Sequence, residues 1–180
     1  MREFIVTVNS TVDLQREWVE ERNVPVVPLK YTIDGETYTD MYGLTGKEFF
    51  AKLREGHMSV TSQVNPDEAK AALEPYLKEG KDIAFLTLGD PSVYSTYWYI
   101  HQRVVKQGYQ AQMIAGVPSF CAVAAKLGIS LSEAEQPLHI IPGSYPCTEQ
   151  MLQTEGTKVI MKTGRSVEQV KKLLKQYGYY

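Results

Sequence analysis

The chain has 180 residues, of which 43% are hydrophobic and 22% charged, as expected of a globular protein. Its formal net charge of −2 gives no basic surface for nucleic acid. No apolar run approaches the roughly 20 residues of a membrane helix, and the first residues lack a signal peptide's apolar stretch, so we expect a cytoplasmic protein without nucleic-acid or membrane partners.

Strands and helices alternate along the first part of the chain. Asp34-Gly35 is a favoured two-residue turn and predicts a hairpin over residues 30–39. Thr45 and Glu48 have the spacing of a capping box, which predicts a helix start. Asn65-Pro66 predicts another start, with a cap followed by proline at the first helical position. The other elements expected here are strands over 4–8 and 24–29, and helices over 12–21, 45–55 and 65–80.

The second part of the chain continues the alternation. Residues 82–88 form a nearly continuous apolar run, which predicts a central strand of a parallel sheet. Ser166 and Gln169 are expected to cap the last helix. The remaining elements expected here are strands over 111–115, 138–141 and 157–162, and helices over 92–107, 118–128 and 166–178.

This order of elements predicts an α/β fold. We expect a single three-layer αβα sandwich with a mainly parallel, flavodoxin- or Rossmann-like open sheet. No linker rich in proline or glycine lies near Gly80. Residues 1–180 are therefore expected to form one domain.

Cysteine and histidine residues give no sign of a metal site. Cys121 and Cys147 are too few for a disulfide framework and lack zinc-ligand spacing. His57, His101 and His139 are scattered along the chain. We predict neither a bound metal nor a catalytic residue.

Residues 1–80 contain the stretches IVTVNSTVDL, VPVVPLKYTIDGETYTD and VTSQVNP. These stretches resemble the front of a DegV-type fatty-acid-binding protein. The resemblance implies that the hydroxyl groups of Ser10, Thr61 and Ser62 bind a fatty-acid carboxylate, helped by the dipole of a helix that begins near Val12.

Two departures accompany this resemblance. Asn9 stands where the family usually has aspartate, and the family's second lobe has no counterpart in the sequence. The alternative interpretation is that Ser10 and Thr61 only cap local turns, as serine and threonine commonly do.

Residues from about 82 to 175 contain AFLTLGDPSVYSTYWYI, IAGVPSFCAVAAKLGISL and LHIIPGSY. These stretches resemble the precorrin-2 methyltransferase of the cobalamin pathway, a tetrapyrrole methylase that uses S-adenosylmethionine. The cofactor-binding residues that the resemblance implies are Gly89, Asp90, Pro91, Ser95, Thr96, Gly116, Val117, Ser119 and Phe120.

The stretch from Gly89 to Thr96 follows the predicted central strand, where open α/β sheets bind ligands. Methyl transfer from a sulfonium depends on positioning more than on a strong acid or base. However, the family's glycine-rich N-terminal segment and its second domain are not matched. The alternative interpretation is a strand-to-helix turn that binds no ligand.

Taken together, the two resemblances predict a chimera with a DegV-like segment over residues 1–80 and a methyltransferase-like segment over 81–180. We expect an engineered or recombined scaffold without evolved catalytic activity, which requires no cofactor but retains weak binding of S-adenosylmethionine. The alternatives are a fragment of an S-adenosylmethionine-dependent precorrin-2 methyltransferase and a fatty-acid-binding module. A small-molecule ligand and a homodimer, formed through surfaces that lost domains would cover, are the expected partners.

Overall fold

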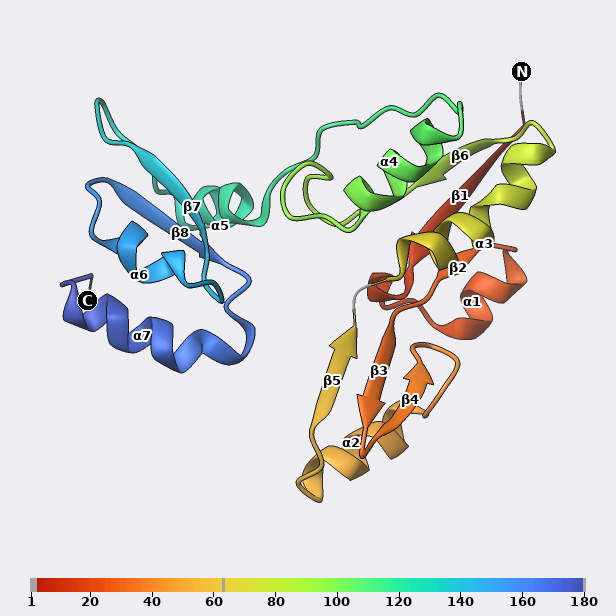
Figure 1. The fold of residues 1–180 in the computed structure, drawn as a ribbon, viewed down its shortest axis with the longest axis horizontal. Helices are drawn as coiled ribbons and strands as arrows, with labels where there is room; N and C mark the ends of the chain where they lie inside the picture. The colour runs from red at the N-terminus through yellow and green to blue at the C-terminus, as the bar shows by residue number, and fades with distance from the viewer. Residues whose placement is uncertain (1–2, 63, 180) are drawn as a thin grey trace. The chain divides into compact units, whose positions relative to one another are not determined.

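The computed structural model describes residues 3–62 and 64–179, which divide into two compact units (Figure 1). The first unit ends at Gly116 and the second begins at Val117. None of the described helices is long and apolar enough to cross a membrane. Each unit has buried residues of its own.

A parallel sheet of three strands, in the order β2-β1-β6, organises the first unit. β1 (Phe4–Asn9) lies between β2 (Val26–Val27) and β6 (Asp82–Phe85). The short 3-10 helix η1 (Ser10–Val12) follows β1 directly. The longer helices of this unit that accompany the sheet are α1 (Arg16–Glu21), α3 (Pro66–Lys78) and α4 (Tyr97–Lys106).

The core of the first unit lies where α3 and α4 meet the sheet. Ala69 and Leu73 of α3 and Ile100 of α4 are buried together with Val27 and Val64. Each fully buried aliphatic side chain of this kind stabilises a fold by about 1.5–3 kcal/mol. This packing fixes the position of α4, and therefore of the loop that joins β6 to α4.

An antiparallel sheet in the order β4-β3-β5 completes the first unit. Asp34 and Gly35 both have positive φ, of 55° and 81°, as the expected tight hairpin turn requires. The elements of this part are β3 (Lys30–Ile33), β4 (Glu36–Thr39), α2 (Gly46–Arg54) and β5 (Ser59–Ser62).

The second unit is built on the parallel pair of β7 (Leu138–Pro142) and β8 (Thr157–Met161). Ile141, Leu152 and Val170 are its most buried aliphatic side chains. They bring together β7 and two of the helices that cover the pair. Its helical elements are α5 (Ser119–Leu127), α6 (Cys147–Leu152), η2 (Gly164–Ser166) and α7 (Val167–Gln176).

The mixed α/β class with parallel sheets is confirmed, whereas a single three-layer sandwich is not. The described strands form three small, separate sheets. The run over 82–88 is a strand only from Asp82 to Phe85 and is an edge strand of its sheet rather than a central one. Residues 111–115 form no strand, because an apolar run becomes a strand only where a partner supplies the ladder of hydrogen bonds.

Helix boundaries differ from expectation in two places. The helix expected over 12–21 begins only at Arg16, and the one expected over 92–107 begins only at Tyr97. Left-handed backbone at Asp13 (φ 56°) and Tyr94 (φ 49°) interrupts the helical path before each start. The sequence also gave no indication of β5 or α6.

Candidate functional site

The loop that follows β6 carries the sharpest motif of the sequence, and Asp90 is its centre. One oxygen of the Asp90 carboxylate accepts hydrogen bonds from the amide nitrogen of Ser92 at 2.8 Å and from its hydroxyl at 2.5 Å. The other oxygen accepts from the amide nitrogen of Gly116 at 2.9 Å. Asp90 therefore ties its own loop to a segment 26 residues further along the chain.

Gly116 is in contact with the backbone of this loop. A Cβ atom added at Gly116 would lie 2.0 Å from the carbonyl oxygen of Gly89. No side chain fits at that distance, so only glycine allows the close approach. Gly89 itself has φ of 84°, a conformation that glycine adopts without strain.

The hydrogen bonds at Asp90 also set its charge. Bonds from the Ser92 hydroxyl and amide, and then from the Gly116 amide, lower the pKa of Asp90. The carboxylate is therefore ionised at neutral pH. The three hydrogen bonds that it accepts are therefore charge-assisted, which makes them stronger than bonds to a neutral acceptor.

The remaining predicted cofactor residues divide between the units. Ser95 accepts a hydrogen bond from the amide nitrogen of Tyr97 at 3.1 Å and so holds the start of α4. Thr96 precedes α4, and its hydroxyl bonds to no other residue that the structure describes. Pro91 lies inside the Asp90 loop. Val117, Ser119 and Phe120 belong to the second unit, where Ser119 and Phe120 open α5.

These groups suit a ligand with polar ends. The Asp90 loop offers a ligand three kinds of group. These are backbone that can be approached closely, the hydroxyl of Thr96 and the half-exposed ring of Tyr94. Such uncharged groups can form hydrogen bonds with hydroxyl, amino and carboxylate groups of a ligand. No cluster of three metal-ligating side chains occurs within residues 3–62 and 64–179.

The predicted fatty-acid residues gather at the start of β3. Ser10 is buried, and its hydroxyl accepts a hydrogen bond from the amide nitrogen of Leu29 at 3.0 Å. Ser62 donates to the carbonyl oxygen of Lys30 at 3.1 Å, and Thr61 pairs with Tyr31 in the sheet.

One part of this expectation is wrong. No α-helix begins near Val12, because the three-residue 3-10 helix η1 ends there and α1 starts at Arg16. The dipole expected beside Ser10 is therefore not in place. Gln63, which belongs to the same sequence motif as Thr61 and Ser62, lies outside the described residues.

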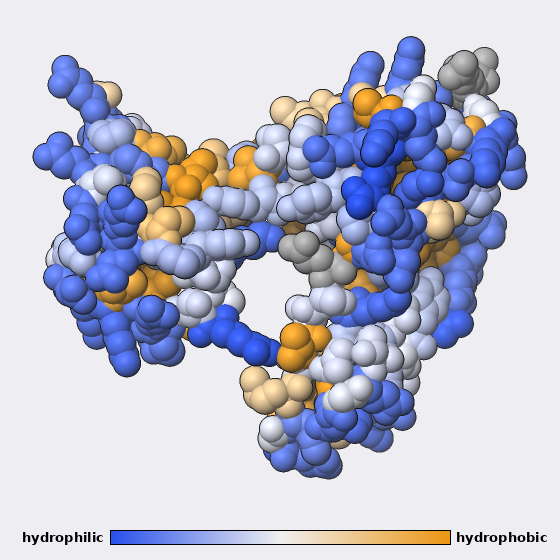
Figure 2. All heavy atoms as spheres, in the orientation of Figure 1, coloured by the Kyte–Doolittle hydropathy of each residue, from blue (hydrophilic) through white to orange (hydrophobic). Residues whose placement is uncertain are grey.

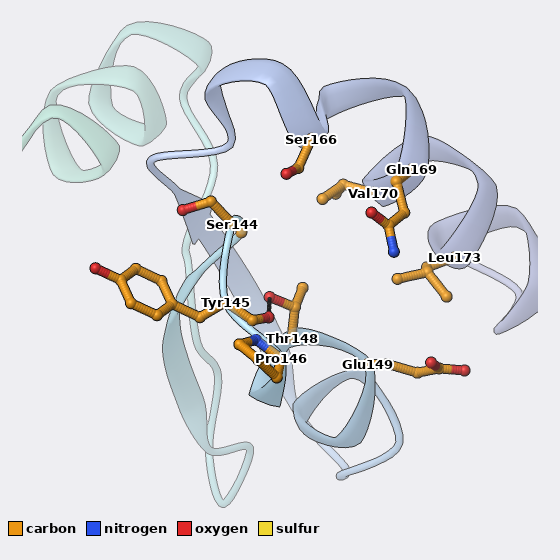
Figure 3. Close-up of a pocket in the computed structure, with 10 residues that line it drawn as sticks. Ser144, Tyr145, Pro146, Thr148, Glu149, Ser166, Gln169, Val170 and Leu173 are labelled. Atoms are coloured by element: carbon orange, nitrogen blue, oxygen red, sulfur yellow. Dashed lines mark hydrogen bonds between the residues drawn. The ribbon is translucent and has the colours of Figure 1, made fainter.

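The second unit contains a cavity of about 270 Å³ that the sequence did not reveal (Figure 3). It lies between the loop after β7, α6 and the first turns of α7. The sequence feature that corresponds to the cavity is the polar stretch after the predicted 138–141 strand, because ligands bind at the carboxyl ends of parallel strands. The residues that line it are Gly143, Ser144, Tyr145, Pro146, Thr148, Glu149, Ser166, Gln169, Val170 and Leu173.

Comparison with known proteins gives a match to one family over most of the chain. A family model described as Tetrapyrrole (Corrin/Porphyrin) Methylases matches residues 20–180. The chain is 37% identical over 92 residues to a probable cobalt-precorrin-2 C(20)-methyltransferase of Methanocaldococcus jannaschii, covering 51% of this chain and 40% of that protein. It is 34% identical over 114 residues to the cobalt-precorrin-2 C(20)-methyltransferase of Salmonella typhimurium, covering 62% of this chain and 48% of that protein. The chain thus spans half or less of the length of these two relatives.

DegV proteins are also similar to this chain. A DegV domain-containing protein of Staphylococcus aureus is 29% identical over 154 residues, covering 77% of this chain and 53% of that protein. The solved structure of a fatty-acid-binding DegV family protein from Thermus thermophilus superposes with a TM-score of 0.53 at 23% identity, over 73% of this chain and 50% of that one. At 23% identity, the similarity to this solved structure shows a shared fold only.

The mixed resemblance predicted from the sequence is confirmed, and both likenesses extend across residue 80. The methylase model begins at residue 20. The DegV alignment covers 77% of the chain, which is more than either 1–80 or 81–180 can hold. The comparisons give no support to an inactive scaffold, because the curated relatives in one of the two groups are named as methyltransferases.

Proposed function

The chain belongs to the tetrapyrrole (corrin/porphyrin) methylase family, and from this membership we propose that it is part of an S-adenosylmethionine-dependent methyltransferase. The substrate class we propose is a precorrin-2-type tetrapyrrole, as named for two relatives. The residues proposed to contact the cofactor are those of the first unit, in the loops around Asp90 and Gly116.

One observation carries this proposal, namely the hydrogen bond from the Gly116 amide to the Asp90 carboxylate, together with the close approach of Gly116 to the Gly89 carbonyl oxygen. The two loops lie far apart in the sequence. The ionised Asp90 side chain joins them by a hydrogen bond, and the absence of side chains at Gly89 and Gly116 lets their backbones lie in contact. Such an arrangement presents backbone groups to a ligand at close range. A turn that only connected β6 to α4 would not need the bond to Gly116.

S-adenosylmethionine, when bound, supplies an electrophilic methyl group. The role proposed for the chain is to bind and orient, since displacement at a methyl group depends mainly on alignment. Asp90 holds the loop closed, and Thr96 offers a hydroxyl to the ligand. No residue of the Asp90 loop has to give or take a proton for this role.

Thermal unfolding with excess S-adenosylhomocysteine tests the proposal. Ligand at 100 times its dissociation constant stabilises a folded protein by about 2.7 kcal/mol, which raises the melting temperature of a chain of this size by roughly 5–10 °C. Asp90→Ala should reduce the shift. The matched control Glu133→Ala, an exposed acidic residue outside both loops, should keep it.

A melting temperature that the ligand leaves unchanged in the unaltered chain would reject cofactor binding. An equal shift in Asp90→Ala and in the control would reject the Asp90 loop as its site. The circular dichroism spectrum of Asp90→Ala should match that of the unaltered chain, which shows that the variant remains folded.

Fatty-acid binding is the second candidate, and the grouping of Ser10 and Ser62 beside β3 favours it. The DegV-like fold is compatible with this function. Mass spectrometry under denaturing conditions should then detect a co-purified fatty acid that is lost in Thr61→Val. Thr61 is the suitable position because it is exposed and its side chain has no partner among the described residues. A spectrum free of lipid would count against this candidate.

A further inference from the structure

β7 and β8 form a small parallel sheet with no third strand among the described residues (Figure 1). A pair of strands is marginally stable on its own, and parallel pairing is slightly weaker per residue than antiparallel pairing. A slip of one residue in the pairing would also turn every side chain of a strand to the opposite face. The second unit therefore needs contacts that hold the two strands in their observed register.

The ammonium group of Lys158, in β8, makes contacts of this kind. It donates hydrogen bonds to the carbonyl oxygens of Thr154 at 2.6 Å, Glu155 at 3.0 Å and Gly156 at 3.0 Å. An ammonium group has three N–H donors, so the three carbonyl oxygens match its full capacity. These residues directly precede β8, and the end of the loop from α6 therefore folds around the charge.

Backbone dipoles hold the charge of Lys158. Desolvation lowers the pKa of Lys158, because removal from water disfavours the charged form. Hydrogen bonds from the ammonium group to carbonyl oxygens act in the opposite direction, and such charge-assisted bonds are roughly twice as strong as neutral ones. Carbonyl oxygens are also ligands of metal cations. Lys158 therefore occupies the position that a bound cation would have in such a loop.

His139 connects β7 to the same loop. It lies opposite Lys158 in the register of the two strands, and its Nε2 atom is 2.8 Å from the carbonyl oxygen of Glu155. A carbonyl oxygen only accepts hydrogen bonds, so Nε2 carries the proton. The Glu155 carbonyl oxygen thus accepts one hydrogen bond from each strand. A slip of the register would separate the two donors that meet there.

The backbone segments that precede the two strands are also in contact. The amide nitrogen of Thr157 donates to the carbonyl oxygen of Pro137 at 2.9 Å. A Cβ atom at Gly156, whose φ is 96°, would lie 2.3 Å from the same oxygen. Glycine alone permits this approach. The ammonium group is thus bonded to the residue at which the amino ends of β7 and β8 meet.

We propose that Lys158 is an internal cation that closes the loop before β8 and fixes the register of β7 and β8. The register in turn determines where the loops at the opposite ends of the strands lie, including Gly143, which lines the cavity of this unit. This role of Lys158 requires neither S-adenosylmethionine nor a fatty acid. Its test uses neither ligand and is therefore independent of the functions proposed above.

The ammonium resonance of Lys158 tests the proposal in the unaltered chain. Ammonium protons held in hydrogen bonds exchange slowly with water, whereas those of exposed lysines exchange rapidly. Nitrogen-15 nuclear magnetic resonance spectra at neutral pH should contain an ammonium signal that disappears in Lys158→Met. The matched control Lys172→Met, at an exposed position of α7, should retain that signal. Absence of the signal from the unaltered chain would overturn the proposal, whether or not the variants fold.

Hydrogen exchange of the β7 and β8 amides measures the effect on the strands. Lys158→Met removes the donors and keeps a long side chain. It should speed exchange of these amides at least about tenfold, which corresponds to about 1.4 kcal/mol. Exchange of the β1 and β3 amides, in the first unit, should be unchanged. Lys172→Met should leave all these rates as they are. Equal rates for the β7 and β8 amides in the two variants would contradict the role of Lys158.

A small ammonium ion should restore the contacts where the side chain is removed. Lys158→Ala leaves the three carbonyl oxygens without their donors and leaves space for propylammonium. Added propylammonium should therefore slow exchange of the β7 and β8 amides in this variant. Tetramethylammonium at the same ionic strength has the same charge but no N–H donor, and it should have no such effect. Equal protection with the two ions would overturn the role of the N–H donors.

Discussion

At the scale of single residues, Gly116 and Asp90 determine the geometry of the loops after β6. The glycine is required by a backbone contact and not by its own φ, since a Cβ atom would meet the Gly89 carbonyl oxygen. The aspartate is required by its charge and by its two acceptor oxygens. Substitutions of Gly116 and of Asp90 should therefore disturb these loops for different physical reasons.

Gly116→Ala should destabilise the first unit by about 1–3 kcal/mol, because an added methyl group must displace the Gly89 backbone. Urea unfolding measures the change. Gly46→Ala is the matched control, since a Cβ atom there has open space at the start of α2. Alanine at Gly46 should be neutral or stabilising by about 0.5–1 kcal/mol. Equal effects at both positions would contradict the close contact at Gly116.

The lowered pKa of Asp90 makes a contribution to stability that depends on pH. An aspartate in an unfolded chain titrates near pH 3.9, and the folded value lies below this. The contribution of Asp90 is therefore complete above about pH 4 and is lost as the pH falls through the folded pKa. Asp90→Asn should flatten the fall in the free energy of unfolding below about pH 4. Parallel acid-unfolding profiles for both proteins would contradict this prediction.

At the scale of elements, the signals that depend on near neighbours in sequence were reliable. The capping box at Thr45 is present, with the Glu48 amide donating to the Thr45 hydroxyl at 3.3 Å and the Thr45 amide donating to the Glu48 carboxylate at 2.8 Å. The Asp34-Gly35 turn and the helix start at Asn65 are also as expected. An exception is Ser166, whose side chain makes no cap bond to α7, because η2 leads directly into that helix.

Thr45→Ala should lower the free energy of unfolding by about 1 kcal/mol, the usual cost of losing an N-cap side chain. Thr45→Ser retains the hydroxyl and should keep most of the stability. Urea unfolding of the three proteins makes the comparison. A Thr45→Ser protein as unstable as Thr45→Ala would show that the methyl group, and not the cap bond, is responsible.

Sequence reasoning failed where an element depends on distant residues. Residues 86–88 and 111–115 have the composition of strands, but neither segment belongs to a described strand. Leu86 donates one backbone hydrogen bond to Thr7 of β1 at 2.9 Å, and the pairing stops there. The cavity beside Gln169 was missed for a similar reason, since α6 and α7 approach each other only through the fold. The Asp90 loop was recognised as a motif, yet its bond to Gly116 could not be inferred from either segment alone. Which of the site residues bind a ligand remains a prediction.

At the scale of the whole molecule, the unusual property is the amount of exposed apolar side chain. Leu88 is 95% exposed and Ile114 is 84% exposed in the first unit. In the second unit, hydrophobic side chains gather at the surface over α5 and β7, where Val123 and Leu127 are exposed (Figure 2). Contiguous apolar surface larger than a few hundred Å² typically marks an interaction site.

This surface predicts that the chain associates with itself. Sedimentation equilibrium should show a mean mass that rises with concentration above the 20.3 kDa of one chain. Leu127→Glu should reduce the association, because it places a charge in the apolar surface of α5. Lys126→Glu, on the same helix, is the control for added negative charge. A mass of 20.3 kDa at all concentrations would contradict the prediction.

The bond between Asp90 and Gly116 also provides a spectroscopic reporter. An amide proton that is donated to a carboxylate is drawn away from its nitrogen, so the Gly116 resonance should lie downfield of ordinary glycine amides. Its position should move when acid neutralises the carboxylate, and its exchange with solvent should be slowed while the two loops remain paired. A single peak would thus follow the opening and closing of this loop pair in solution.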